Sequence, residues 1–321
     1  MQDRPAPLLT VCVCTRDRPR YLVDCLAALR LQTVGPHRFE ILVVDSASAP
    51  IAAGEMARLV AGMPNARLLR LERPGISFAR NEGAAAARSD WIAYLDDDAI
   101  ASADWAETIL DVIARPAPPA LFGGRILPLW EAPLPRWWPG RLIGVLSLIE
   151  CAEAGEYRAP GMPKGLEPYA ANMVVHRPAL MAAGGFLDTI GRYGTALLSD
   201  EEVQLAWRLQ GLGYSARHEP RLVVRHQVQA ARLNPAWLMR RLFWQGASSV
   251  VTRRAVGEPG RVWRALPRRL AVAALFAPAA LVPASSPRLI AVRWRLAYSV
   301  GFVRAALGWQ PGRAARLQAA K

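Results

Sequence analysis

Cysteine is scarce in this chain, and no two cysteines have the CxxC spacing typical of metal-binding or redox sites. The 321 residues include only Cys12, Cys14, Cys25 and Cys151, and none of them forms a CxxC pair. We therefore expect free, buried thiols in a reducing cytoplasm. The first residues also lack the charged-then-apolar layout of a secretory signal, so no export is expected.

Two glycine-rich phosphate-binding motifs are absent as well. The lack of GxGxxG removes the best support for a dinucleotide-binding domain, and the lack of GxxxxGK[ST] argues against a P-loop. Apolar residues make up 52% of the chain, well above the range of disordered proteins. The length is sufficient for one large core, or for one domain with an appended segment.

Acidic residues are nearly missing from the last part of the chain. Residues 232–321 contain sixteen basic side chains and a single acidic one, Glu258, whereas residues 1–231 are close to neutral. The formal net charge of +14 therefore belongs to a basic tail. We expect one domain over 1–231 and a separate tail over 232–321.

The first third of the chain alternates between two hydrophobic periods. Continuous apolar runs are typical of buried strands, and the segments between them have helical spacing. Strands are predicted at 8–14, 39–45, 66–72 and 91–95, and helices at 20–32, 51–63 and 76–89. This alternation predicts an α/β fold, with a Rossmann-like, mostly parallel sheet flanked by helices.

After Pro116 the pattern is less regular. Strands are predicted at 120–129 and 221–226, a strand and short helix at 169–186, and an amphipathic helix at 199–214. Between them, Trp130, Trp137 and Trp138 lie in a proline-rich loop. Since sugars stack on aromatic faces, the loop could line a carbohydrate site, or it could simply close the edge of the core.

Polar side chains follow three of the predicted strands. Thr15, Arg16 and Asp17 follow the first strand, Asp45 ends the second, and the sequence DDD at 96–98 follows the fourth. Ligands of such sheets bind beyond the carboxyl ends of the strands. We therefore expect these side chains to gather at one edge.

Three adjacent carboxylates repel one another, so a positive partner is expected among them. Carboxylates at D-x-D spacing behind a buried strand can hold Mg²⁺ or Mn²⁺ and leave positions for diphosphate oxygens and water. The alternative is a solvated acidic turn that caps a helix starting near Ser102.

Five segments, in this order, resemble family 2 glycosyltransferases of the GT-A fold. They are VCVCTRDRPRYLVDCLAALRLQT, ILVVDSAS, RPGISFARNEGAAAARSDWIAYLDDDA, AANMVVHRPALMAAGGF and SDEEVQLAWRLQGLGY. The resemblance implies transfer of a sugar from a nucleotide-diphosphate sugar to an acceptor hydroxyl with inversion, in polysaccharide or glycolipid synthesis. It also implies a donor half at about 8–115 and an acceptor half at about 116–231.

The resemblance assigns roles residue by residue. It implies nucleotide-sugar binding by Thr15, Arg16, Asp45, Arg80, Asn81, Asp96 and Asp97. It implies that Asp96 and Asp98 bind the metal, with His226 as a third ligand or else as a structural histidine. For Arg80 a salt bridge to the acidic edge is the alternative. Ser46 stands where the family often has Asn or Asp, which leaves the base preference open.

The expected general base lies in the acidic segment 200–202. By register with LAWRLQGLGY, the family's Glu-Asp pair falls on Glu201 and Glu202, so Glu202 is the predicted base. Asp200 is a competing carboxylate. The alternative is an acidic first turn without a catalytic role, favoured there by the helix dipole.

The tail combines basic and apolar residues. We predict an amphipathic helix at 234–254, an uncharged stretch at 270–287 that borders on the length of a membrane span, and an interfacial helix at 289–309. The tail is expected to bind anionic lipid on the inner face of the cell membrane, which would suit a lipid-linked acceptor. The alternative is a helical subdomain packed on the core.

Two other functions share some of these features. A nucleotidyltransferase would have a similar sheet and metal, but it should show a glycine-rich basic loop where this chain has CTRDRPR. A non-enzymatic basic module would need neither DDD nor the acidic pair at 201–202. No nucleic-acid partner is therefore expected.

Overall fold

The chain divides into two compact units. The computed structural model describes residues 6–163, 165–188, 197–280 and 287–309. The first unit comprises Met1–Leu129, Ser147–Phe186 and Leu205–Gln227, and the second comprises Trp130–Leu146, Leu187–Gln204 and Val228–Lys321. The second unit thus combines the basic tail with two earlier segments.

The first unit begins with four parallel strands, as predicted. They are β1 (Leu9–Thr15), β2 (Phe39–Ser46), β3 (Ala66–Leu71) and β4 (Trp91–Asp96), and they lie in the order β3-β2-β1-β4. Every residue of β2 is buried, and so is all of β1 except Cys14. The continuous apolar runs therefore become central strands of a sheet that is covered on both faces.

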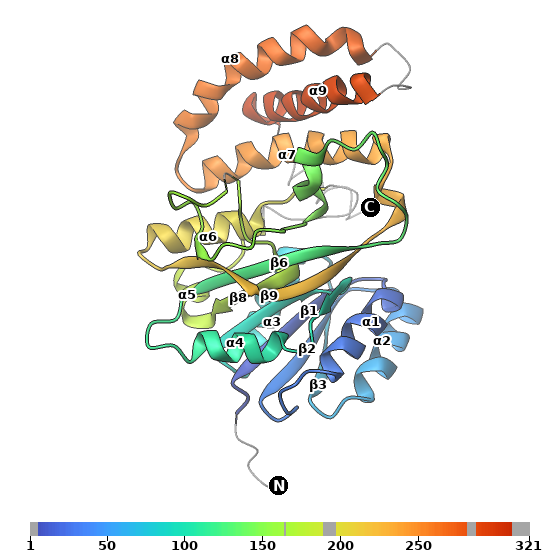
Figure 1. Cartoon of the computed structure of the whole chain (residues 1–321), viewed down its shortest axis with the longest axis vertical. Helices are drawn as coiled ribbons and strands as arrows, with labels where there is room; N and C mark the ends of the chain where they lie inside the picture. Colours follow the sequence, from blue (N-terminus) through green and yellow to red (C-terminus); the bar gives the residue numbers. More distant parts are fainter. Residues whose placement is uncertain (1–5, 164, 189–196, 281–286, 310–321) are drawn as a thin grey trace. The chain divides into compact units, whose positions relative to one another are not determined.

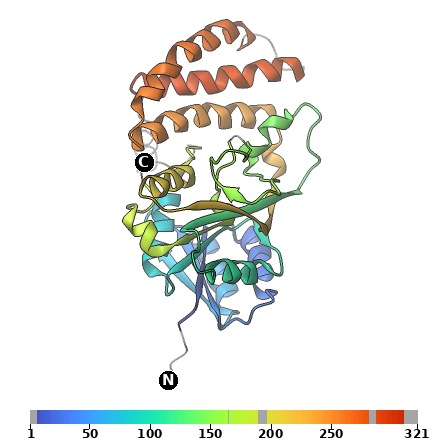
Figure 2. The same cartoon turned by 60° about the vertical axis from the view of Figure 1, so that its left-hand side comes forward.

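Helices connect these strands and cover the two faces. They are α1 (Pro19–Arg30), α2 (Pro50–Ala61) and α3 (Ile76–Ala86), close to the predicted ranges. Figures 1 and 2 show α1 and α2 on one face of the sheet and α3 on the other. The predicted α/β class with helices flanking a parallel sheet is confirmed for this part of the chain.

Antiparallel strands extend the sheet beyond β4. They include β5 (Ala99–Ala101), β6 (Leu121–Trp130), β7 (Gly155–Glu156), β8 (Met173–His176) and β9 (Ala216–Val228). Strand β8 pairs antiparallel with β4 and β6, and β9 pairs antiparallel with β5 and β7. The strand predicted at 221–226 is thus the second half of the longer β9.

Three further helices belong to this part of the fold: α4 (Trp105–Ile113), α5 (Arg177–Ala182) and α6 (Glu201–Gly211). The inward face of the sheet packs with α3, α5 and α6 in one core, in which Tyr94 and Phe186 meet edge to face at 5.3 Å. Short 3₁₀ helices lie at Gly140–Leu146, Ala170–Asn172, Ala230–Arg232 and Ala277–Ala280. The four cysteines are free thiols, as predicted, but only Cys12 and Cys25 are buried, and Cys14 and Cys151 are partly exposed.

The second unit is built on three long helices, α7 (Pro235–Ala255), α8 (Pro259–Phe276) and α9 (Pro287–Ala306). Figures 1 and 2 both show α9 between α7 and α8. Helices α7 and α9 approach closely because Gly246 faces the Tyr298 carbonyl and Gly301 faces the Phe243 carbonyl, where no Cβ would fit.

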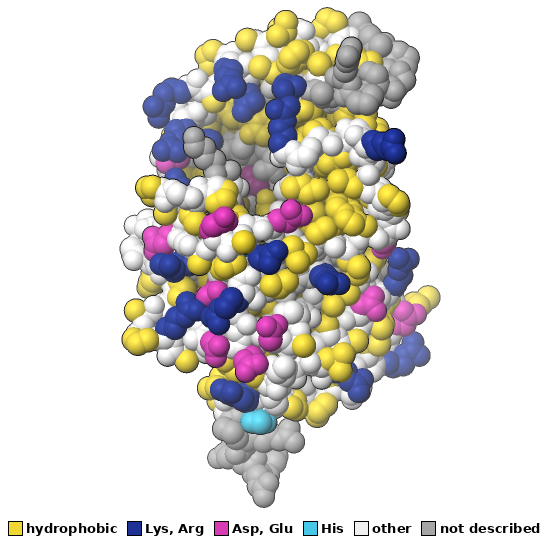
Figure 3. Space-filling view, in the orientation of Figure 1, with side chains coloured by type: hydrophobic (Ala, Val, Ile, Leu, Met, Phe, Trp, Pro, Cys, Tyr) yellow, Lys and Arg dark blue, Asp and Glu magenta, His cyan; other side chains and the backbone are white. Residues whose placement is uncertain are grey.

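The tail was expected to contain a stretch near the length of a membrane span. Among the described residues, no helix combines the length and hydropathy needed to cross a bilayer. Helix α8 ends at Phe276, and residues 281–286 of the stretch at 270–287 lie outside the described part. Hydrophobic and basic side chains instead lie together over α8, at the top of Figure 3.

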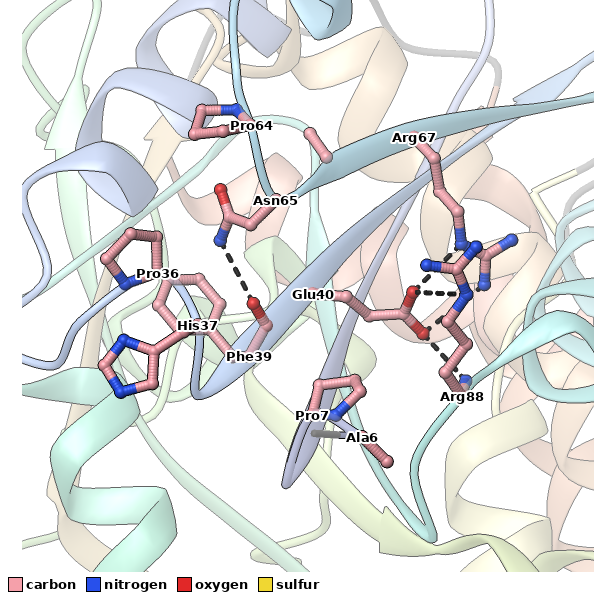
Figure 4. A pocket seen from close by; sticks show the side chains of 11 residues that line it. Ala6, Pro7, Pro36, His37, Phe39, Glu40, Pro64, Asn65, Arg67 and Arg88 are labelled. Atoms are coloured by element: carbon pink, nitrogen blue, oxygen red, sulfur yellow. Dashed lines mark hydrogen bonds and ion pairs between the residues drawn. The ribbon is translucent and has the colours of Figure 1, made fainter. Parts of the chain in front are cut away.

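A buried carboxylate ties the amino ends of three strands together. Glu40 accepts hydrogen bonds from the Thr10 hydroxyl at 2.7 Å, from Arg67 Nε at 2.9 Å and from the Arg88 backbone N–H at 2.7 Å. Burial alone would raise the pKa of this carboxylate, but these bonds, with that from Arg67 the largest, outweigh burial and lower the pKa. Figure 4 shows Glu40, Arg67 and Arg88 beside an open pocket at this amino-terminal edge.

Replacing Glu40 should therefore destabilise the fold in a pH-dependent way. We expect Glu40→Gln to lose about 1–3 kcal/mol of unfolding free energy at pH 7, because Arg67 keeps its charge but loses a carboxylate partner. A carboxylate whose folded pKa is lowered stabilises the fold above its unfolded pKa, near 4.5, and this stabilisation disappears as the pH falls through the folded value.

Urea unfolding at pH 7 and at pH values below about 4.5 measures this effect. The difference between wild type and Glu40→Gln should shrink in acid. The exposed Glu55→Gln on α2 is the matched control and should differ little from wild type at either pH. A deficit that stays constant from pH 7 into acid would contradict this account of Glu40.

Candidate active site

Three strand ends converge at the carboxyl edge of the parallel sheet, as the sequence predicted. The pairing of β1 with β2 places Thr15 beside Asp45, and the pairing of β1 with β4 places Cys14 beside Asp96. The polar residues that follow β1, β2 and β4 therefore meet at one edge. The pocket of Figure 4 lies at the opposite, amino-terminal ends of these strands.

The carboxylates of Asp97 and Asp98 are buried rather than solvated. Their side chains are 4% and 2% exposed, whereas that of Asp96 is 35% exposed. A solvated acidic turn, the alternative left open by the sequence, is therefore wrong for two of the three residues.

Arg18 supplies the positive charge among these acids. Its guanidinium donates from Nη1 to Asp97 at 2.8 Å and from Nη2 to Asp98 at 2.6 Å, and it lies 4.5 Å from the centre of the Tyr21 ring. Charge-assisted bonds of this length are among the stronger hydrogen bonds in proteins. Although burial opposes the charge, the two carboxylates raise the pKa of Arg18 further above its usual value.

Asp97 is held on its other side by the first strand. The Thr15 hydroxyl donates to Asp97 Oδ2 at 2.7 Å. Burial raises the pKa of Asp97 to about 7, and the neighbouring Asp98 adds to this shift, while Arg18 and Thr15 oppose it. Asp97 is therefore held in place by Arg18 and Thr15 together, and it carries a pKa close to neutrality.

His226 reaches the acids from a distant part of the chain. Strand β9 pairs with β5 so that Ala99 faces His226, and the Gln227 N–H donates to the Asp98 carbonyl at 2.8 Å. His226 Nε2 consequently lies 3.2 Å from Asp98 Oδ1, and both side chains are 2% exposed. Its Nδ1 has no hydrogen-bond partner among the described residues.

This arrangement offers a divalent cation a partial site. In the described part of the chain, no three side chains of His, Cys, Asp or Glu converge as a metal cluster. Asp98 and His226 do meet, and a carboxylate next to an imidazole suits Mn²⁺ or Mg²⁺ if the remaining ligands come from outside the protein. The buried, unpartnered Nδ1 of His226 is also compatible with such a site.

Asp45 is completely buried and anchored at the end of β2. It accepts from the Ser48 N–H at 2.9 Å and from Arg70 Nη1 at 2.9 Å. The loops that follow β1 and β2 are also joined, because Asp17 accepts from the Ala49 N–H at 2.7 Å. Arg16 is about half exposed and forms a long ion pair, 3.5 Å, with Asp17.

Arg80 and Asn81, both on α3, have different surroundings. Arg80 is buried and lies 3.6 Å from Asp96, so the predicted alternative of a salt bridge to the acidic edge is observed. Asn81 donates to the Phe186 carbonyl and accepts from the Phe186 N–H, both at 2.8 Å. Asn81 thus fixes the segment that follows α5, and its role in nucleotide binding stays a prediction.

The acidic segment 200–202 belongs to the second unit and begins α6. Asp200 has a φ of 78°, in the left-handed region that is strained for a residue with a side chain. Both of its oxygens accept from Gln245 Nε2, at 2.8 and 3.0 Å. Burial raises the pKa of Asp200 more than these bonds lower it. Glu201 and Glu202 are both buried in the first turn of the helix.

The tryptophans of the proline-rich loop also lie in the second unit. Trp138 is buried, and its ring lies 5.5 Å from that of Trp137. Their contact with an acceptor stays a prediction.

Sequence reasoning missed two cations of this site. Arg18 and Arg70 bind the predicted acids Asp97, Asp98 and Asp45, but neither was singled out. The sequence TRDR could have indicated Arg18. Arg18 lies three residues beyond Thr15, just after β1, and β1 is the neighbour of β4, which leads into the acids at 96–98. Arg70 gave no comparable signal within the apolar strand ARLLRL.

The chain is similar to known glycosyltransferases. Residues 10–138 match the family described as Glycosyl transferase family 2. A glucosyl-dolichyl phosphate glucuronosyltransferase of Haloferax volcanii is 30% identical over 181 residues, which are 56% of this chain and 56% of that protein. The succinoglycan biosynthesis protein ExoM of Rhizobium meliloti is 27% identical over 237 residues, 73% of this chain and 71% of that protein. The chain thus spans about half the length of the Haloferax relative.

Solved structures show the same fold. The mannosyltransferase PcManGT from Pyrobaculum calidifontis, in complex with GDP-Man and Mn²⁺, matches with a TM-score of 0.58 and 16% identity over 94% of this chain and 88% of that one. The structure of S. aureus TarS 1–349 matches with a TM-score of 0.51 and 13% identity over 94% and 92% of the two chains. The predicted GT-A fold and the resemblance to family 2 are confirmed.

Removing the Arg18 charge should destabilise the acidic edge. Loss of one partner of a buried ion pair typically costs about 3–5 kcal/mol, and since Arg18 is itself partly exposed we expect about 2–3 kcal/mol for Arg18→Gln. Arg16→Gln is the matched control and should cost less than about 0.5 kcal/mol, because its pair with Asp17 is exposed. Equal losses for the two variants in urea unfolding would contradict the assignment of Arg18 as the counter-charge.

Proposed function

We propose that this chain is a family 2 glycosyltransferase and that it transfers a sugar from a nucleotide-diphosphate sugar to an acceptor hydroxyl with inversion. The observation that carries the proposal is the meeting of Thr15, Asp45 and the acids at 96–98 at the carboxyl edge of the parallel sheet. This is the edge at which open α/β sheets bind nucleotides. Carboxylates repel a diphosphate unless a cation lies between them. The acids at 96–98 therefore favour a diphosphate donor that binds together with a divalent cation.

The donor would lie along this edge. Asp45, with Thr15 beside it, would contact the base or ribose, and Arg80 lies next to Asp96 on the side of α3. Arg16 is exposed beside these residues and is free to move toward a bound ligand. The preferred base would depend on groups such as Ser46, whose hydroxyl accepts from the Gly75 N–H at 3.1 Å.

A divalent cation, Mn²⁺ or Mg²⁺, would be held by Asp98 with Asp96 and His226 nearby. When bound, it would neutralise the diphosphate leaving group as a Lewis acid. One oxygen of Asp98 now accepts from Arg18 and the other contacts His226. Arg18 must therefore release Asp98 before a cation can use that carboxylate, and the diphosphate offers Arg18 another anionic partner. Cation and donor should consequently bind together.

Glu202 would act as the general base. The acceptor oxygen attacks the anomeric carbon, its proton passes to the Glu202 carboxylate, and the bond to the diphosphate breaks on the opposite face. Asp200 accepts from Gln245 through both oxygens. The choice of Glu202 over Asp200 rests on its register with the family's acidic pair. Glu201 remains the neighbouring alternative in the same turn.

The acceptor would be a carbohydrate or a lipid-linked sugar in polysaccharide or glycolipid synthesis. Two of the relatives bear on this. One is named for a dolichyl phosphate substrate and the other for succinoglycan biosynthesis. The sixteen basic residues of 232–321 support association with an anionic membrane surface on the cytoplasmic side.

Donor binding should depend on Asp98. We expect Asp98→Ala to abolish Mn²⁺-dependent binding of a nucleoside diphosphate, because it removes the carboxylate shared by Arg18 and His226. Isothermal titration with UDP and GDP, with Mn²⁺ or with a chelator, measures this. Asp111→Ala, an exposed acid on α4, is the matched control and should bind as wild type does. If wild type binds the nucleoside diphosphate with the same affinity in Mn²⁺ and in chelator, the metal assignment is wrong.

Transfer should depend on Glu202 while donor binding does not. Glu202→Gln keeps size and hydrogen bonding but cannot accept a proton, so turnover should fall by roughly 10²–10⁴-fold with little change in donor affinity. Turnover on any working acceptor, measured beside calorimetric donor affinity, separates the two effects. If Glu202→Gln stays active while Glu201→Gln or Asp200→Asn is inactive, the base is another residue of this segment.

A further inference from the structure

Helix α8 exposes a continuous apolar stripe. Trp263, Leu270 and Leu275 are 54%, 46% and 71% exposed, which is unusual for side chains of this size. Their neighbours on the same side of the helix are small or apolar. With 3.6 residues per turn, the exposed residues that share this side are Trp263, Pro267, Leu270, Ala271 and Ala274, with Leu275 at its margin.

The opposite side of α8 is already used. Val262 and Leu266 are buried in a cluster with Ala247 and Val250 of α7 and with Phe302 of α9. The helix therefore has one face that stabilises its own unit and another apolar face that these helices do not cover. Unpartnered apolar surface of this kind usually marks a site of association.

Arginines line one edge of the stripe, and Leu275 lies on that side of the helix, between the directions of Arg264 and Arg268. Arg261, Arg264 and Arg268 are exposed along its edge, and Arg261 pairs with Glu258 at 3.3 Å. No ion pair of Arg264 or Arg268 occurs within the described part of the chain. Since Glu258 is the sole acidic residue of 232–321, the field around the stripe is positive. The chemistry that complements it is apolar and anionic at once (Figure 3).

Helix α9, which the sequence favoured as the interfacial helix, is placed differently. It lies between α7 and α8, and several of its cations have partners inside the unit. Arg304 stacks over Trp309 at 4.9 Å, and Arg293 donates to the Ala279 carbonyl at 2.8 Å. A helix with neighbours on both sides has less surface for lipid. The interfacial helix expected at 289–309 stays a prediction, and α8 offers the larger exposed apolar face.

We propose that the stripe of Trp263, Leu270 and Leu275 on α8 lies in the headgroup region of an anionic bilayer, with Arg264 and Arg268 on lipid phosphates. This inference rests on the proposed membrane association of the tail and names the surface responsible for it. Amphipathic helices with aromatic and basic residues lie in the plane of the interface, and tryptophan is enriched at that depth. Such binding needs no membrane-spanning helix.

Flotation of the full chain with lipid vesicles tests the proposal. Vesicles of phosphatidylcholine mixed with phosphatidylglycerol should carry the wild type to the top of the gradient, and vesicles of phosphatidylcholine alone should carry much less. The double variant Leu270→Ser, Leu275→Ser should bind the anionic vesicles at least about tenfold more weakly. It removes two leucine side chains that would leave water and enter the bilayer on binding. Leu212→Ser, an equally exposed leucine outside the tail, is the matched control and should float as wild type.

A charge variant separates lipid headgroups from other apolar partners. Arg264→Gln, Arg268→Gln should lose most of the preference for phosphatidylglycerol and become less sensitive to salt, because fewer cations face the lipid phosphates. All these substitutions lie on the surface, so melting temperature and Mn²⁺-dependent nucleoside diphosphate binding should stay those of the wild type.

Three results would overturn the assignment to α8. If the double leucine variant floats as well as wild type, the stripe is not the surface, although the membrane proposal for the tail stands. If the wild type does not float at all, both the stripe and the membrane proposal fall, whereas sugar transfer to a soluble acceptor remains testable. If the leucine variant instead abolishes a concentration-dependent dimer that forms without lipid, the occupant is a second copy of the chain.

Discussion

The balance of charge around Asp96, Asp97 and Asp98 is the constraint on which the site depends. Two of these carboxylates are almost completely buried at the end of β4, where unpaired negative charges would be costly. The Thr15 hydroxyl comes from the end of β1, Arg18 from the segment that follows β1, and His226 from β9. Strand β1, which pairs with β4, and strand β9, which pairs with β5, therefore both supply partners for these acids. A diphosphate with a divalent cation could take over that role from Arg18, which links the structure of the free site to its proposed chemistry.

The sequence was informative about this edge for a physical reason. Buried parallel strands are continuous apolar runs, and their carboxyl ends must meet, so the apolar pattern alone is enough to place Thr15, Asp45 and Asp96 together. The contact of His226 with Asp98 could be suggested only by resemblance, because it depends on the antiparallel pairing of β5 with a strand more than 120 residues later. The bridge from Arg18 depends on how a flexible side chain packs, and the left-handed backbone of Asp200 depends on its bonds to Gln245. No local pattern encodes these features.

In the tail, too, the composition could be read from the sequence, whereas the packing of the helices could not. Its charge was evident from the near absence of acids, and α7 and α9 were close to the predicted ranges, whereas α8 was not predicted as a helix. Which helix is exposed could not be deduced, because α8 and α9 both mix arginine with apolar residues. Gly246 and Gly301 let α7 and α9 approach closely. Helix α9 therefore lies between its neighbours, and the outer face of α8 is not covered by these helices.

The central claim is that the carboxyl edge of the sheet binds a nucleotide-diphosphate sugar together with a divalent cation. The most direct measurement is thermal unfolding of the full chain with UDP-, GDP- and dTDP-sugars, each in the presence of Mn²⁺ and of a chelator. We predict that at least one donor raises the melting temperature with Mn²⁺ and that the chelator removes this rise, because ligand binding to the folded state stabilises it by mass action. Stabilisation that is indifferent to the cation, or none with any of these donors, would contradict the account.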